Sequence, residues 1–231
     1  VHRGISGLDE VLSMRAYRLA GVPSAPATWI QWRVVTDAEE VAKDPYKGDL
    51  WGLYVAIGEM TPDLLADRVL PNGLVVSTQS GIKHAPKGMA EPQKEWDTFL
   101  NGMRSNPNEE WWRKNLDLPA YCGFHAMNRL LGNVDLRPDG NHGYYRRPDG
   151  RWAPIPWDND MMFVPRHHQP GIIDAVGCLK HPAIALEYRN RAREILDLFA
   201  ADAGDRGGQI GQLVADLGSA LTPKGQDTDW S

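Results

Sequence analysis

The sequence has few cysteines and no long apolar segment, and both shortages narrow the classes of protein that it can encode. Cys122 and Cys178 are its only cysteines and neither belongs to a CxxC pair, so no disulfide framework is predicted, although one bond between them is allowed. No apolar run approaches the length of a membrane-spanning helix, and the N-terminus lacks the pattern of a signal peptide. We therefore expect a globular protein without a transmembrane segment.

Positive charge and several common ligand-binding motifs are scarce as well. With 25 Lys and Arg against 30 Asp and Glu, the net charge is -5, which argues against a nucleic-acid-binding protein that relies on a broad basic surface. The lack of a GxxxxGK[ST] motif excludes Walker-type phosphate binding, and the lack of HExxH and H-x3-H motifs argues against zinc. The remaining composition, 42% hydrophobic and 24% charged, is typical of a protein with a packed core.

The hydrophobic pattern changes from strand-like to helix-like near residue 90. ATWIQWRVV and WGLYVAIGE alternate apolar and polar residues as half-buried strands do, and NGLVVSTQS indicates a third strand. Helical periodicity follows, interrupted by a polar β-hairpin over residues 143–158 with its turn at Pro148-Asp149-Gly150. The longest helices are expected at 117–133, 181–201 and 209–221. The sequence therefore predicts an α+β fold, strand-rich over residues 1–90 and helical over residues 91–231.

Many acids are concentrated in GNVDLRPDGNHGYYRRPDGRWAPIPWDNDMMF, residues 132–163, which we call the acidic stretch. It contains Asp135, Asp139, Asp149, Asp158 and Asp160 among apolar residues, and an ionised carboxylate beside a core needs a partner. Asp139 and Asp149 each precede a glycine, which is typical of turns. The other three are either polar residues that end a helix or strand, or ligands of a cation.

The spacing within the acidic stretch fits what phosphoryl transfer from a nucleotide requires. Mg²⁺ prefers oxygen ligands, and a further carboxylate must accept or orient the proton of the attacking hydroxyl. Asp135 follows a predicted helix, Asn141 comes six residues later, and Asp158 lies across the hairpin. Because the hairpin folds residues 141 and 158 back toward each other, a side chain from each end can meet one ion.

The acidic stretch and its flanks resemble the spore coat protein H (CotH) kinase family. The similarity is carried by LDLPAYCGFHAMNRLLGNVD, by GNHGYYRRPDGRWAPIPWDND and by the helix from His181, and upstream by YRLAGVPSAPATWIQWRVV and WGLYVAIGEMTPDLLADRV. The resemblance implies an atypical protein-kinase-like, two-lobed fold that uses ATP and Mg²⁺ to phosphorylate Ser or Thr hydroxyls of a protein substrate. It also implies a location at the spore coat or the cell surface. Residues 1–90 would then form a partial N-lobe-like region and residues 91–231 a C-lobe-like region of one domain.

The resemblance also assigns roles to individual positions. It implies that Asp135 is the catalytic aspartate and that Asn141 and Asp158 bind the metal, with Asp160 as a second ligand or a brace. Glu59 matches a family glutamate and either contacts the nucleotide or is a surface acid. Where family members often carry a lysine after the strand matching GLVV, this chain has Val76 and Ser77.

The missing lysine leaves the phosphate-binding cation open. Lys83, in the loop-like segment SGIKHAPKG, is a local candidate, and the family's lysine-bearing strands would otherwise precede Val1. One alternative is therefore a binding or surface protein that keeps the fold without catalysis. Others are a carbohydrate-active protein, suggested by nine tryptophans and the Asp158/Asp160 pair, or a nucleotidyl-transfer enzyme. Alternate residues of one strand point to opposite faces, which argues against that pair as glycosidase carboxylates.

Overall fold

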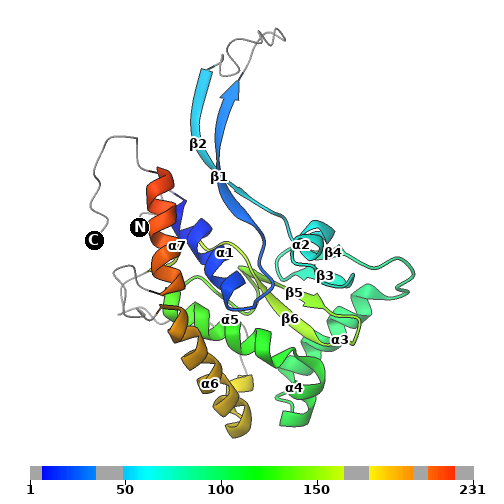
Figure 1. Ribbon diagram of the computed structural model, residues 1–231. Helices are drawn as coiled ribbons and strands as arrows, with labels where there is room; N and C mark the ends of the chain where they lie inside the picture. Colours follow the sequence, from blue (N-terminus) through cyan, green and yellow to red (C-terminus); the bar gives the residue numbers. More distant parts are fainter. Residues whose placement is uncertain (1–6, 35–48, 164–176, 200–207, 222–231) are drawn as a thin grey trace.

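The computed structural model describes residues 7–34, 49–163, 177–199 and 208–221, and it mixes helices and strands as expected of an α+β fold (Figure 1). Its helices are α1 (Leu8–Leu19), α2 (Pro62–Asp67), α3 (Pro92–Arg104), α4 (Glu109–Asn115), α5 (Leu118–Leu131), α6 (Pro182–Phe199) and α7 (Gln209–Leu221), with a short 3₁₀ turn at Cys178–Lys180. Its strands are β1 (Ala27–Val34), β2 (Asp49–Ile57), β3 (Leu74–Ser77), β4 (Gly81–His84), β5 (His142–Arg146) and β6 (Trp152–Pro156).

The strands form two separate antiparallel sheets. β1 and β2 pair as a long ribbon that extends away from the helices in Figure 1, with a bulge between Trp32 and Arg33. The other sheet has the order β4-β3-β5-β6, with Ser77 opposite Gly143 and His142 opposite Pro156. Because β3 precedes residue 90 and β5 follows it, this sheet joins the two parts that the sequence pattern separates.

The β5–β6 hairpin is buried rather than polar, which corrects the expectation from the sequence. Every residue of β6 is buried, and Tyr144 and Tyr145 of β5 are fully buried on opposite faces. The polar residues responsible for the expectation lie at the turn, where Asp149 accepts hydrogen bonds from Arg151. The hairpin is therefore a central element of the core.

Helix α5 is held against this hairpin by its first residues, and it ends at the acidic stretch. Asp117 caps the helix by accepting a hydrogen bond from the Ala120 amide at 3.3 Å, and it pairs with Arg147 at 2.6 Å. Gly132 ends the helix in the left-handed conformation (φ 66°), which glycine adopts without a steric penalty. Both ends were expected from the sequence, and both are confirmed.

Aromatic rings from α3 and the hairpin pack together in the core. Phe99 stacks on Trp152 with ring centroids 4.7 Å apart, and Trp96 lies 5.6 Å from both Trp152 and Tyr144. Trp112 of α4 is also fully buried. These tryptophans are core residues, which removes them from any sugar-stacking surface.

The structure agrees with the low cysteine content and with the lack of a long apolar segment in the sequence. Both cysteines are buried and neither is in a disulfide, and burial raises the pKa of the Cys122 thiol to about 12. None of the helices in the described residues is both long and apolar enough to cross a bilayer.

We expect Trp152→Ala to lower the free energy of unfolding by about 3–5 kcal/mol, because it leaves a cavity in the aromatic core. Trp32→Ala is the matched control, since Trp32 is 51% exposed and Trp152 only 2% exposed, and it should change stability by no more than about 0.5 kcal/mol. Urea denaturation followed by circular dichroism measures both. Equal effects of the two substitutions would contradict the assignment of Trp152 to the core.

Candidate functional site

The β5–β6 register places Asn141 and Asp158 at the same end of the hairpin. His142, next to Asn141, pairs with Pro156, and Asp158 follows two residues later, while the Pro148–Gly150 turn closes the other end. The chain therefore doubles back after α5, as the spacing of the acidic stretch suggested. Asp158 is exposed and Asn141 is buried, with 2% of its surface accessible.

Both of these residues have an unusual backbone conformation. Asn141 has φ 61° and Asp158 has φ 53°, in the left-handed region that residues other than glycine seldom occupy. Asn and Asp tolerate this region better than most residues, but it still strains the backbone. Such strain is often found at functional sites, and the two proposed metal ligands share it with Val69, Asn106 and Phe163.

The side chain of Asn141 connects directly to Asp135. Its Nδ2 donates to Asp135 Oδ2 at 2.8 Å and to the Asp135 carbonyl at 2.9 Å, while its Oδ1 accepts from Gln79 Nε2 at 3.0 Å. Gln79 lies in the turn between β3 and β4, and the sequence gave no reason to single it out. The structure therefore brings Asp135 and Asn141 together and adds Gln79, which orients the amide.

Two buried asparagines link the loop of Asp135 to the loop of Asp158 and Asp160. Asn133 Oδ1 accepts from the Asp135 amide at 2.9 Å, and Asn133 Nδ2 donates to Asn159 Oδ1 at 3.4 Å. Both side chains are buried, so these hydrogen bonds are shielded from water. Both asparagines belong to the motifs that carry the family resemblance, although the sequence alone assigned them no role.

Helix α1 contributes a carboxylate that sequence reasoning missed. Glu10 Oε1 accepts a hydrogen bond from the Asn159 backbone amide at 3.1 Å. Burial raises the pKa of Glu10, the nearby charges of Asp158 and Asp160 raise it further, and the hydrogen bond from Asn159 opposes them. The pKa of Asp9 is also raised, by burial and then by Asp160. This part of the molecule therefore concentrates negative charge, which favours a cation.

Asp158 and Asp160 do not lie on a strand, because β6 ends at Pro156. The argument that their side chains must point to opposite faces of one strand is therefore wrong. Both carboxylates contribute, after burial, to the raised pKa of Glu10. Asp160 is half-buried, whereas Asp158 is exposed.

The structure places Lys83 and Glu59 on the surface. The segment around Lys83 was expected to be a loop, but Gly81–His84 forms strand β4, with Ile82 opposite Val76 of β3. Lys83 is exposed on this edge strand, and Glu59 is exposed between β2 and α2. Among the described residues, neither charged group has a hydrogen-bond or ion-pair partner, so both remain accessible to a ligand.

Other cationic side chains of the acidic stretch differ in their availability. Arg146 pairs with Glu95 at 3.2 Å and Arg147 pairs with Asp117, so both have structural roles at the far end of the hairpin. Arg137 is exposed, and its guanidinium group packs against Gly140: a Cβ atom at position 140 would lie only 3.2 Å from Arg137 Nη2. His142 is not a cation at neutral pH, because burial lowers its pKa to about 4.

The donor atoms at the site suit a magnesium ion that binds together with phosphates. Within the described residues, no group of three or more His, Cys, Asp or Glu side chains is arranged to hold a metal ion. A kinase-type Mg²⁺ site needs fewer protein ligands, because phosphate oxygens and water complete its coordination. Asn141 Oδ1 and the Asp158 carboxylate are hard oxygen donors of this kind.

We expect Glu10→Gln to raise the melting temperature at pH 7, because it removes a charge beside Asp158 and Asp160 and keeps an acceptor for the Asn159 amide. Glu10→Ala should instead lower stability by about 1–3 kcal/mol, because that buried amide loses its acceptor. Differential scanning calorimetry measures both variants, with the exposed Glu110→Gln on α4 as control. A Glu10→Gln protein less stable than Glu10→Ala would contradict this account.

Comparison with known proteins identifies the family. The model of the family described as CotH kinase protein matches residues 45–195, well over half of the chain. The match includes the loops of Asp135 and Asp158 and the hairpin between them, whereas α1 with Glu10 lies ahead of it. No curated protein matches the chain significantly. The chain belongs to the CotH kinase family.

Proposed function

We propose that the protein transfers the γ-phosphoryl group of ATP, with Mg²⁺, to Ser or Thr hydroxyls of a protein substrate. The observation that carries this proposal is the 2.8 Å hydrogen bond from Asn141 to Asp135. It joins a carboxylate that could accept the proton of a hydroxyl to an amide that could bind a metal ion, as in the catalytic loop of protein kinases. Membership of a kinase family supports it. Within this proposal, residues 1–90 form a partial N-lobe-like region and residues 91–231 a C-lobe-like region of one domain, and the β4-β3-β5-β6 sheet joins them.

The residues of the acidic stretch take distinct roles in the proposed reaction. Asp135 orients the substrate hydroxyl and accepts its proton as the hydroxyl oxygen bonds to the γ-phosphorus, while the bond from that phosphorus to the β,γ-bridging oxygen breaks and ADP leaves. Asn141 Oδ1 and Asp158 would hold Mg²⁺, with Asp160 as a second ligand or a brace. Bound Mg²⁺ neutralises charge on the phosphates of the nucleotide.

Nucleotide contacts are proposed for residues outside the acidic loops. Lys83 and Arg137 are exposed cations that can approach phosphate oxygens, and Glu59 is assigned to the nucleotide side of the site. Met60, beside Glu59, packs against Gly143, where no side chain larger than hydrogen fits. This contact holds the Glu59 segment close to the start of β5, two residues from Asn141.

A catalytically reduced protein of the same fold, with a binding, surface or structural role, is the second candidate, because one observation favours it. The strand position at which the family often carries a lysine is filled by Val76, which is fully buried. Ser77 Oγ accepts hydrogen bonds from the Gln79 and Ser80 amides, so it shapes the turn. No cation stands at this position to contact a phosphate.

We expect Asp135→Asn and Asp158→Asn to separate chemistry from binding. Mg-ATP at 100 times its dissociation constant should stabilise the unmodified protein by about 2.7 kcal/mol in a thermal-shift assay. Asp158→Asn should lose this stabilisation. Asp135→Asn should retain it while lowering transfer of labelled γ-phosphate, to the protein itself or to a serine-rich acceptor, by roughly 10²–10⁴-fold.

Asp139→Asn is the matched control for these variants, because Asp139 is a turn residue of the same stretch. It should leave both measurements unchanged. Normal transfer by Asp135→Asn would refute the catalytic assignment, and Mg-ATP stabilisation of Asp158→Asn would refute the metal assignment. Stabilisation of the unmodified protein without transfer to any acceptor would instead support the reduced protein.

A further inference from the structure

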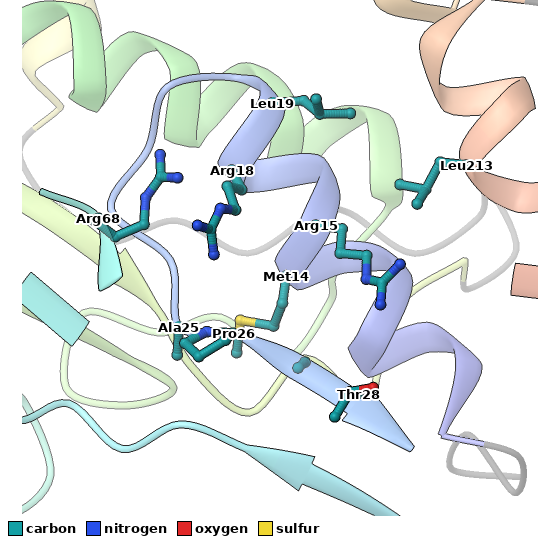
Figure 2. Close-up of a pocket in the computed structure, with 10 residues that line it drawn as sticks. Met14, Arg15, Arg18, Leu19, Ala25, Pro26, Thr28, Arg68 and Leu213 are labelled. Atoms are coloured by element: carbon teal, nitrogen blue, oxygen red, sulfur yellow. The ribbon is translucent and has the colours of Figure 1, made fainter. Parts of the chain in front are cut away.

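A cavity of 710 Å³ lies on α1, away from the residues assigned to phosphotransfer. It is bounded by α1, by the start of β1 and by Arg68 after α2, and Leu213 of α7 also lines it (Figure 2). Neither Asp135, Asn141 nor Asp158 lines this cavity. A volume of this size is in the range of sites that bind small molecules.

The charged side chains of the cavity are all arginines. Arg15 and Arg18 extend from α1 and Arg68 follows α2, and none of the described residues that line the cavity is acidic (Figure 2). Arg18 is balanced by Asp67 at 2.7 Å, whereas Arg15 has no ion pair with any described residue. The cavity therefore carries an excess of positive charge in a protein whose net charge is -5.

Arg68 is the least satisfied of the three. Its Nε atom is buried and has no hydrogen-bond partner among the described residues. Burial lowers the pKa of Arg68, the neighbouring charge of Arg18 lowers it further, and the charge of Asp67 opposes them. An anion bound in the cavity would offset the repulsion between the guanidinium groups of Arg18 and Arg68.

Apart from Thr28, the other described lining residues are apolar and lie between the arginines. Met14, Ala25 and Ala27 are buried, Pro26 lies beside them, and Leu19 stands partly exposed at the edge. No aromatic ring lines the cavity on which a nucleobase could stack, and no glycine-rich loop is present to cradle phosphates. This composition suits a ligand that combines several anionic groups with an aliphatic side chain, as an acidic peptide does.

We propose that this cavity binds an acidic peptide segment of a partner protein. The anionic side chains of the segment pair with Arg15 and Arg68, and a neighbouring apolar side chain rests on Met14 and Pro26. Carboxylates and phosphoserines both supply the required charge, so the partner is defined by this shared chemistry. This proposal does not rest on the proposed phosphotransfer, because peptide binding to the cavity can be measured whether or not the protein transfers phosphate.

The probe for the test is a fluorescein-labelled peptide in which two glutamates precede and two follow a leucine, with Gly-Ser flanks. Fluorescence anisotropy should show salt-sensitive binding of this peptide and at least tenfold weaker binding of its glutamine analogue. A phosphoserine analogue identifies which source of charge binds more tightly. Inorganic phosphate and ATP are added as competitors.

The double substitution Arg15→Gln with Arg68→Gln should weaken peptide binding at least tenfold, and Arg68→Lys should lose less than Arg68→Gln because it keeps the charge. Arg18 is left unchanged, since it holds α2 through Asp67. The exposed Arg104→Gln on α3 is the matched control and should bind like the unmodified protein. Thermal unfolding of every variant confirms that it is folded at the temperature of the assay.

Three results would overturn the proposal. The first is equal binding of the glutamate peptide and its glutamine analogue. The second is unchanged binding by the folded double variant, or an equal loss in Arg104→Gln. The third is that phosphate or ATP displaces the peptide, binds with an affinity equal to that of the peptide, and loses affinity equally when Arg15 and Arg68 are substituted. That result would indicate a simple anion or nucleotide site. A protein without phosphotransfer activity that still binds the peptide would leave the proposal standing.

Discussion

The candidate site depends on buried amide hydrogen bonds that hold two loops together. One loop follows α5 and carries Asp135, and the other follows β6 and carries Asp158 and Asp160. Asn133 and Asn159 bond to each other between them, and the Val134 amide donates to the Met161 carbonyl at 3.4 Å. Because a buried polar group without a partner costs about 1–3 kcal/mol, these contacts favour one relative position of the two loops. These hydrogen bonds between the two loops therefore help to position the carboxylates of Asp135, Asp158 and Asp160.

Helix α1 brings opposite charges to two different parts of the molecule. Asp9 and Glu10 lie in its first turn and Arg18 in its last, which is the distribution that the helix dipole favours. The acidic end meets the loop of Asp158 and Asp160, and the basic end borders the cavity on the other part of the helix. Met14 belongs to both regions, since it lines the cavity and its Sδ lies 3.5 Å from Asn159 Nδ2. A ligand in the cavity would therefore contact a residue that also supports the acidic loops.

Features set by neighbours in the sequence were predictable, and features set by distant partners were not. The cap of α5 at Asp117, its end at Gly132 and the hairpin turn follow from local residue types, and all were expected. Strand β4 was missed because its four residues include Gly81, Lys83 and His84, and only pairing with β3 makes them a strand. Glu10 and Gln79 were missed for the same reason, because their partners are remote in the chain. The roles given to Asp135, Asn141 and Asp158 remain predictions.

Two kinds of strain coincide at the ends of the hairpin strands. The backbone is left-handed at Asn141 and Asp158, and burial together with the nearby charge of Asp160 raises the pKa of both Asp9 and Glu10. The same left-handed conformation also occurs at Val69, Asn106 and Phe163, while α5 is capped and the core is apolar. A fold keeps such strain only where the surrounding structure enforces it, and here the buried asparagines do so. Under the proposed function, a divalent cation held by Asn141 Oδ1 and Asp158 would lower the electrostatic repulsion that Asp158 and Asp160 exert on Glu10, and this relief would contribute to the free energy of binding.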